Sequence, residues 1–260
     1  MKIVVLAKQV PDTWSDRKLD LETGLLDRAA SEPVPDEINE RALENALQYK
    51  DSQSDTEVVV VTMGPEGATT TVRKLLSMGA DSGVLVTDDA VAGSDMVQTA
   101  RVLAATIEKI GGVDLVVAGN EATDGRGGMV PAMVAEILSL PVLPGLEEIE
   151  ISADAVSGTA SVDGGTVKLS ASYPAVASVT EKTAEARFPN FKGIMAAKKK
   201  PVENWTVADL GIQAGPESAS VRSVMVSAAA RPEKQAGPKV VDDGTAAAQL
   251  ADFLAAERRI

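Results

Sequence analysis

The stretch from Asp114 to Leu138 limits the possible folds more than any other part of this sequence. Residues 114–118 form a short apolar run that is typical of a buried strand. Residues 119–128 contain four glycines, and apolar residues at helical spacing follow them. This order predicts a strand, a glycine-rich loop and a helix N-terminus. Its backbone N–H groups and the positive end of the helix dipole can bind an anion such as phosphate.

The loop sequence alone leaves two interpretations open. It matches neither G-x-G-x-x-G nor G-x-x-x-x-G-K-[ST], the two common phosphate-binding patterns. An ordinary strand-to-helix turn also uses glycines, because they permit a tight chain reversal. The surrounding pattern therefore has to separate a nucleotide site from a simple turn.

Strand and helix alternate through the first 140 residues. Apolar runs at 3–7, 58–61, 84–86 and 115–118 predict strands, and amphipathic helices are expected between them. This alternation predicts an α/β fold with a doubly wound, mostly parallel, Rossmann-like sheet. Because ligands of such sheets lie beyond the carboxyl ends of strands, the loops after Ala7, Val61 and Ala118 are candidates for one site.

The pattern changes after Pro141. Short runs near 148–151, 155–161 and 167–170 predict an antiparallel meander at one edge of the sheet, and residues 175–179 are assigned to it. Residues 187–200 fit neither a regular helix nor a strand. Residues 201–241 show little periodicity, so they either cover another surface or stay unfolded. The last segment, 245–259, predicts an amphipathic helix with Leu250, Phe253 and Leu254 on one face.

Composition excludes several classes of function. The net charge is −13, and Lys198–Lys200 is the only basic run, so nucleic-acid binding is not expected. Cysteine and histidine are both absent, which removes the usual thiolate and imidazole catalysts and metal ligands. We expect no catalytic side chains and no metal site. No apolar run reaches the length of a membrane span, so a cytoplasmic protein without membrane insertion is predicted.

Several segments in a fixed order resemble the beta subunit of electron transfer flavoproteins over essentially the whole chain. These segments are KIVVLAKQVPDT, EINERALENAL, VTMGPEGATTTVRKLLSMGAD and NEATDGRGG, followed by VDGG, YPAVASVT and FKGIMAAKKKP. Two departures are visible. Val167 stands where the family often has an acidic residue, and GRGG replaces a polar, Gln-containing version of the loop.

The resemblance implies a heterodimer with an electron transfer flavoprotein alpha subunit. FAD would be held mainly by the alpha subunit, and the beta subunit would bind AMP in a structural role. Such a pair accepts electrons from flavin dehydrogenases, such as the acyl-CoA dehydrogenases of fatty acid oxidation, and passes them to a membrane quinone oxidoreductase. The implied parts are a nucleotide-binding domain at 1–185, a recognition loop at 186–200 and an arm at 201–260 that packs on the partner subunit.

The family's AMP site carries over to four segments of this chain. They comprise Leu6 and Ala7; Asp36, Glu37, Ile38 and Asn39; Met63; and Asp124, Gly125, Arg126, Gly127, Gly128, Met129, Val130, Pro131, Ala132, Met133 and Val134. By the same resemblance Val10–Trp14 and Ile38 face the flavin. Without the usual side-chain donors in this loop, Arg126 is the candidate for a phosphate contact.

The family's partner-recognition loop also carries over. Phe191 takes the position of a Leu that inserts into the dehydrogenase, and the expected partner-binding residues are Phe191, Ile194, Met195, Lys198, Lys199 and Lys200. An aromatic side chain beside Pro189, Asn190 and Gly193 has few local neighbours to pack on, so a partner would bury it. The alternative is that Phe191 folds back onto the core.

Three other functions remain open. The first is a bifurcating member of the same family, in which a second FAD occupies the beta-subunit site. The second is a stand-alone ATP-binding regulator of the universal-stress type, although such proteins are usually much shorter. The third is a small hydrolase of the related adenine-nucleotide fold, for which the sequence offers no nucleophile constellation.

Overall fold

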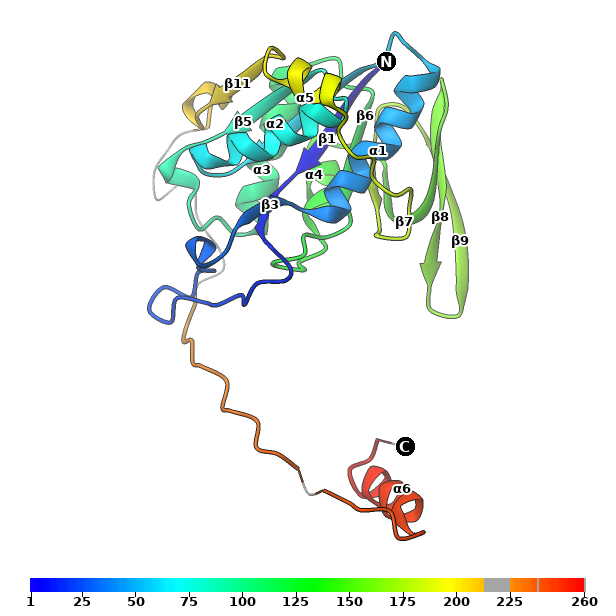
Figure 1. The fold of residues 1–260 in the computed structure, drawn as a ribbon. Coiled ribbons are helices and arrows are strands. Elements are labelled where there is room, and N and C mark those ends of the chain that lie inside the picture. The colour runs from blue at the N-terminus through cyan, green and yellow to red at the C-terminus, as the bar shows by residue number, and fades with distance from the viewer. Residues whose placement is uncertain (213–224, 238, 260) are drawn as a thin grey trace. The chain divides into compact units, whose positions relative to one another are not determined.

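The glycine-rich stretch lies in the middle of a nine-stranded sheet. The computed structural model describes residues 1–212, 225–237 and 239–259, and Figure 1 shows the chain. It consists of two units, Met1–Val226 and Ser227–Ile260. The sheet belongs to the first unit, and the second contains α6 (Ala246–Ala256).

The strand order of the large sheet is β11-β5-β4-β1-β6-β10-β7-β8-β9. Strands from β11 to β7 are parallel neighbours, and β7, β8 and β9 pair antiparallel. The bounds are β1 Lys2–Ala7, β4 Glu57–Met63, β5 Ser82–Val86, β6 Leu115–Gly119, β7 Val142–Ile151, β8 Ala155–Val162, β9 Gly165–Ser172, β10 Ala175–Val179 and β11 Val202–Trp205.

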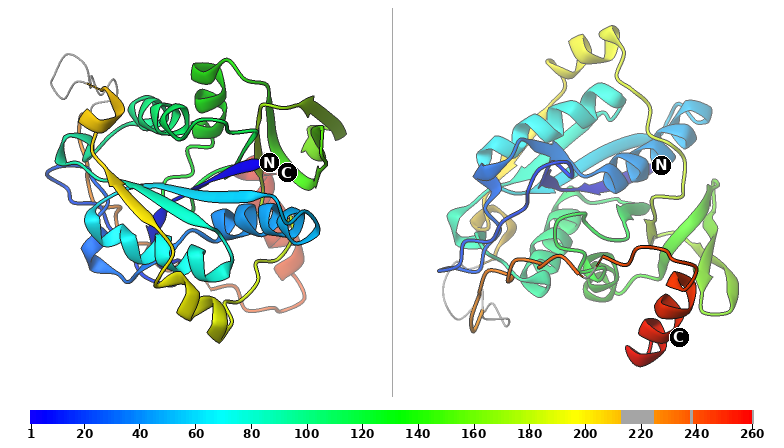
Figure 2. Two further views of the ribbon diagram at one scale, coloured as in Figure 1. Left: turned by 90° about the horizontal axis from the view of Figure 1, so that it is seen from above. Right: turned by 60° about the horizontal axis from the view of Figure 1, so that its bottom comes forward.

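Helices cover both faces of the parallel part, as Figure 2 shows, which confirms the doubly wound α/β fold. Along β1, Ile3 and Val5 join one buried cluster and Val4 and Leu6 join the other, because successive side chains point to opposite faces. The first cluster is completed by α1 and α2, and the second by α3 and α4. Their bounds are α1 Glu37–Ser52, α2 Thr69–Met78, α3 Met96–Ile110 and α4 Val130–Leu138.

The structure differs from the sequence-based prediction at β10. That strand was assigned to the edge meander, but it lies between β6 and β7 and pairs parallel with both. All five of its residues are buried, so it is a central strand. The run AVASV is apolar on both faces, as expected for a strand covered on both sides.

Five further elements were not predicted. The connection 12–32 is closed at its base by an antiparallel pair, β2 (Gln9–Pro11) and β3 (Pro33–Pro35), and contains a short 3-10 helix at Arg28–Ala30. We call residues 12–32 the excursion. Residues 191–197 form α5 (Phe191–Ala197), and β11 adds an edge strand next to β5. Of the stretch 201–241, residues 213–224 and 238 lie outside the described residues.

The second unit consists of a short chain segment and α6. No residue of α6 is buried, and the side chains of Leu250 and Phe253 are both more than half exposed. The predicted apolar face at the C-terminal end of the chain is therefore present and exposed.

Candidate functional site

The order of the strands reverses next to β1. The chain runs from β1 to β4 and β5 on one side, and then crosses to β6 on the other side of β1. In an open α/β sheet the two diverging connections leave a crevice beyond the carboxyl ends at this point. The loops that follow β1, β4 and β6 therefore meet at one edge, as the sequence predicted.

Asp36 joins two of these loops. Its side chain is fully buried, and its Oδ1 accepts hydrogen bonds from the N–H groups of Ile38 and Asn39 at the start of α1. Its Oδ2 accepts a hydrogen bond of 2.6 Å from the N–H of Thr123 in the glycine-rich loop. One carboxylate thus caps α1 and fixes the loop after β6 at the same time.

Gly119 allows α1 to approach the end of β6. A Cβ at this position would lie 2.5 Å from Asn39 Nδ2 and 3.0 Å from Ile38 Cγ2. The Asn39 amide also reaches β1, because its Oδ1 accepts from the N–H of Lys8 at 2.8 Å. The close approach of Gly119 therefore brings β1, β6 and the start of α1 together at the crevice.

The glycine-rich loop leads into α4 without a side-chain cap on the helix. Met129 is the N-cap residue, and none of the described side chains hydrogen-bonds as a cap there. Arg126 and Gly128 have positive φ angles of 48° and 65°, which turn the loop toward the helix. Pro131, the second residue of α4, has no N–H, so the N–H groups of Val130 and Ala132, with the helix dipole behind them, are the ones suited to an anion.

Buried polar atoms without a hydrogen-bond partner lie at this edge. In the described part of the chain, Thr62 Oγ1 near the end of β4 and Asn120 Oδ1 just after β6 make no hydrogen bond. Thr62 is completely buried. A buried polar atom without a partner is costly, so a ligand or water that hydrogen-bonds to it would be favoured. A bound nucleotide fits this pattern at the switch point.

Asp124 makes ion pairs at the centre of the same loop. Its side chain is 1% exposed, and it lies 2.8 Å from Lys8 Nζ and 3.0 Å from Arg28 Nη2. Burial by itself would raise the pKa of Asp124, but Lys8 and Arg28 outweigh it and hold the pKa below its ordinary value of 3.8. The stabilisation is therefore complete at neutral pH and is lost only as the pH falls through the lowered pKa.

The structure brings most of the predicted AMP-site residues to this edge, with different burial. Leu6, Ala7, Asp36, Ile38 and Asn39 are buried around the switch point. Glu37 and the loop residues Gly125 to Met129 are exposed, whereas Val134 lies in the core beneath α4. Sequence reasoning missed Lys8, Arg17, Arg28, Thr62 and Asn120. Arg17 and Arg28 belong to the excursion, and its position beside the glycine-rich loop depends on the β2–β3 pair, which the sequence did not predict.

The predicted partner-binding residues lie on or next to α5. Phe191 is 80% exposed, and Ile194 and Met195 are also exposed, so Phe191 does not fold back onto the core. Lys198 and Lys199 are exposed as well. Lys200 is different, because its Nζ donates to the carbonyls of Leu76 and Ala80, and its burial lowers its pKa.

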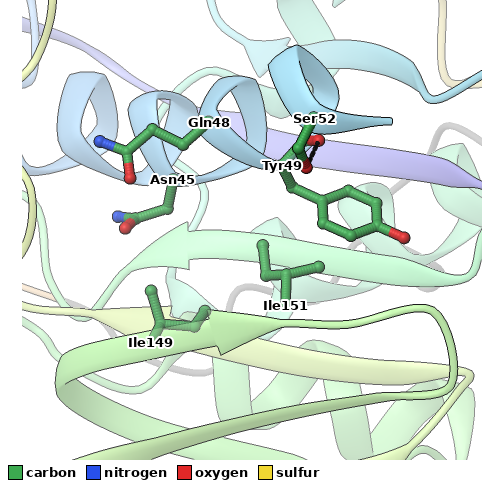
Figure 3. A pocket seen from close by; sticks show the side chains of 6 residues that line it. All are labelled: Asn45, Gln48, Tyr49, Ser52, Ile149 and Ile151. Atoms are coloured by element: carbon green, nitrogen blue, oxygen red, sulfur yellow. Dashed lines mark hydrogen bonds between the residues drawn. The ribbon is translucent and has the colours of Figure 1, made fainter. Parts of the chain in front are cut away.

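A small hollow lies elsewhere on the first unit, between α1 and β7 (Figure 3). It has a volume of about 220 Å³ and is lined by Asn45, Gln48, Tyr49, Ser52, Ile149 and Ile151. Ligand pockets usually enclose roughly 300 Å³ or more. The hollow shares no residue with the crevice, so it is a separate surface feature.

The described residues offer neither a metal site nor a membrane-spanning helix. No group of three or more acidic side chains in this part of the chain could hold a metal ion. Within the same residues, no helix combines the length and the apolar character that a membrane crossing requires.

Comparison with known proteins gives one consistent family. The family model described as an electron transfer flavoprotein domain matches residues 23–210. An electron transfer flavoprotein subunit beta from Mycobacterium tuberculosis is 48% identical over 99% of both chains, and one from Bacillus subtilis is 30% identical over 100% of both. The caffeyl-CoA reductase-Etf complex subunit CarD of Acetobacterium woodii is 37% identical over 82% of this chain and 80% of its own. The chain belongs to the electron transfer flavoprotein family, among its beta subunits.

Proposed function

We propose that this chain pairs with an electron transfer flavoprotein alpha subunit and that the two share one FAD, held mainly by alpha. The observation that carries the proposal is the full-length match to beta subunits. The pair is cytoplasmic, accepts electrons from flavin dehydrogenases, such as acyl-CoA dehydrogenases, and passes them to the respiratory chain through a membrane quinone oxidoreductase. The flavin supplies the redox chemistry when bound, and the protein supplies binding and orientation.

The proposed role of this chain in assembly has two parts. The C-terminal arm presents Leu250 and Phe253 on α6, and an alpha subunit that covers them would remove exposed apolar area from water. Trp14 is 95% exposed in the excursion, where a flavin or partner surface would explain an aromatic side chain. We expect both segments to be covered in the heterodimer.

We further propose that the switch-point crevice binds AMP in a structural role. The N–H groups at the start of α4, with Gly127 and Gly128 before them, would receive the phosphate. Asn120 Oδ1 and Thr62 Oγ1 have no hydrogen-bond partner among the described residues, and polar groups of the ligand would supply one to each. Arg126 is 3.1 Å from Glu121, an exposed ion pair that a phosphate could replace.

Denaturation of the purified heterodimer should release one FAD and one AMP, because the alpha subunit and the crevice each hold one nucleotide. Chromatography of the supernatant against FAD, AMP and ATP standards measures the ratio. Two FAD and no AMP would favour the bifurcating type, which the similarity to a caffeyl-CoA reductase complex subunit makes the second candidate. A protein that releases no adenine nucleotide besides FAD would contradict the AMP site.

The exposed face of α5 is the proposed docking surface for the dehydrogenases. It consists of Phe191, Ile194, Met195, Lys198 and Lys199. Phe188, which is 91% exposed, lies next to it and was not among the predicted residues. An exposed aromatic that becomes buried in a partner can dominate an interface, and the lysines would speed association with an acidic partner. Lys200 is left out because its ammonium group already donates to the protein's own carbonyls.

Replacing Phe191 with Ala should slow electron transfer from a partner dehydrogenase by about tenfold or more, since loss of about 1.4 kcal/mol is a factor of ten. The side chain buries little in the free chain, so melting temperature and nucleotide content should stay unchanged. Stopped-flow reduction of the heterodimer by the dehydrogenase measures the rate. Val162→Ala, which removes an exposed apolar side chain at the end of β8, is the matched control. A lower melting temperature with normal transfer would make Phe191 a core residue.

A further inference from the structure

The excursion is attached to the glycine-rich loop through basic side chains. Lys8 lies directly after β1, and Arg28 lies in the 3-10 helix of the excursion, yet both pair with the one carboxylate of Asp124. Arg28 also donates to the carbonyl of Gln9, at 3.4 Å. The one carboxylate of Asp124 therefore connects the end of β1, the excursion and the loop after β6.

Arg17 adds a second attachment beside the first. Its guanidinium donates to the carbonyl and the hydroxyl of Thr123, the residue before Asp124, and to the carbonyl of Pro11 at 2.9 Å. Thr123 is itself held by Asp36 through its N–H. The excursion thus reaches the glycine-rich loop at two successive residues, and the loop is fixed to α1 on its other side.

The apolar side chains of the excursion contribute little to this attachment. Trp14, Leu19, Leu21 and Leu25 are all at least half exposed. The tip is closed on itself by the bridge between Leu19 and Leu26 and by the turn around Asp20. Polar contacts therefore hold the excursion to the loop, namely the ion pair of Arg28 with Asp124 and the hydrogen bonds of Arg17 to Thr123.

Both carboxylate oxygens of Asp124 take part in ion pairs. Oδ1 faces Lys8 and Oδ2 faces Arg28, and the side chain is 1% exposed. A negative charge in this position would repel a phosphate if it stood alone, and two cations neutralise it. Asp124 is thus placed to orient the loop. It does not bind an anion itself, because an ionised carboxylate has no proton to donate.

We propose that Asp124 is a positioning residue that holds the excursion over the glycine-rich loop through Arg28, while Lys8 ties the same carboxylate to the end of β1, and that Asp124 so controls how fast nucleotide leaves the crevice. The proposal rests on the proposed nucleotide site. The two cations are 41% and 47% exposed, so salt screens the ion pairs and should speed opening.

The first measurement needs no nucleotide. Glu22 is exposed in the excursion, and a glutamate-specific protease cutting there yields a fragment of residues 1–22, which mass spectrometry quantifies. In the full-length chain without its partner subunit, where nothing covers the excursion, Asp124→Asn should raise the cleavage rate about tenfold, a factor that corresponds to about 1.4 kcal/mol. Salt should raise the rate of the unaltered protein and change that of the variant little. Lys182→Gln, which breaks the exposed ion pair to Glu147, should match the unaltered protein. An unchanged cleavage rate in Asp124→Asn overturns the proposal, whatever the site binds.

The second measurement follows release of AMP and of adenosine after a chase with unlabelled ligand. Arg28→Gln keeps Asp124 in place but removes one ion pair, and it should speed release of both ligands by the same factor. Faster release of AMP alone would make Arg28 a phosphate ligand and overturn the positioning role. Faster cleavage without faster release of either ligand would overturn it too. If neither ligand binds the unaltered protein, the AMP site itself is wrong, and the cleavage assay still decides whether Asp124 holds the excursion.

Discussion

Replacing Asp36 with Ala is expected to lower the free energy of unfolding by about 3 kcal/mol. Loss of the helix N-cap at Ile38 and Asn39 costs roughly 1 kcal/mol, and the buried N–H of Thr123, left without a partner, costs about 1–3 kcal/mol more. Asp36 satisfies three N–H groups, those of Ile38, Asn39 and Thr123, and it is completely buried. Thermal melting should show a fall of about 6–12 °C.

Asp36→Asn separates the two tasks of this carboxylate. Its amide oxygen can still cap α1, but the amide nitrogen cannot accept from Thr123. We expect a smaller loss of stability together with an AMP release rate close to that of Asp36→Ala, because the loop after β6 loses its fixed point in both. Equal melting temperatures for Asp36→Ala and the unaltered protein would show that the cap contributes nothing.

Replacing Arg187 with Ala should cost about 2–3 kcal/mol, near the lower end of what breaking a buried ion pair costs. Arg187 binds Glu44 of α1 through two nitrogens, at 2.7 Å and 2.9 Å, and Asp51 at 2.8 Å. The Glu44 side chain is 6% exposed, so without Arg187 a buried charge loses its cation. The Arg187 side chain is 32% exposed, and solvent lowers the cost accordingly.

The variant should also loosen the start of α5, because Arg187 lies four residues before it. Faster proteolysis between 187 and 197, together with a lower melting temperature, would show this. Arg187→Lys keeps the charge but loses the two-nitrogen geometry, so it should lie between Ala and the unaltered protein. The far end of α5 is held independently, since Arg73 donates to the carbonyls of Ala197 and Lys200. Electron transfer per intact heterodimer should therefore fall only modestly.

Local patterns identified α1, α2 and the strands that line the crevice. Asp36 before an apolar 3.6-residue repeat is a local cap signal, and Asp36 is the N-cap of α1. The strand–glycine–helix order of residues 114–138 likewise depends only on neighbouring residues. These elements are the ones that place the proposed nucleotide site.

The position of β10 in the sheet could not be predicted from the residues near it in the sequence. AVASV is a short apolar run in either place, and only its pairing with β6 and β7 makes it central. The same holds for α5, whose Gly193 weakens helix propensity. Gly193 is nevertheless needed, because a Cβ there would lie 2.3 Å from the carbonyl oxygen of Ser77 in α2. Tertiary packing, and not the local sequence, therefore determines the position of β10 and the helical conformation of α5.

The Asp124 ion pairs at the site likewise could not be predicted from the local sequence. Lys8, Arg28 and Asp124 are far apart in the sequence, and no spacing rule connects them. The β2–β3 pair folds the excursion back on itself and brings Arg28 beside the glycine-rich loop. A charged side chain in an irregular segment otherwise suggests only a solvated surface.

The central place of β10 also fixes the order in which the sheet can be completed. Residues 175–179 pair with residues 115–119, about 60 positions earlier, while β7, β8 and β9 are synthesised in between. Such distant parallel pairing forms slowly, because a long loop must close before any contact rewards it. Until that stretch leaves the ribosome, β6 has a hydrophobic edge without its neighbour, and open edges recruit other chains. The interval between synthesis of β6 and β10 is therefore when this chain has most to gain from a chaperone.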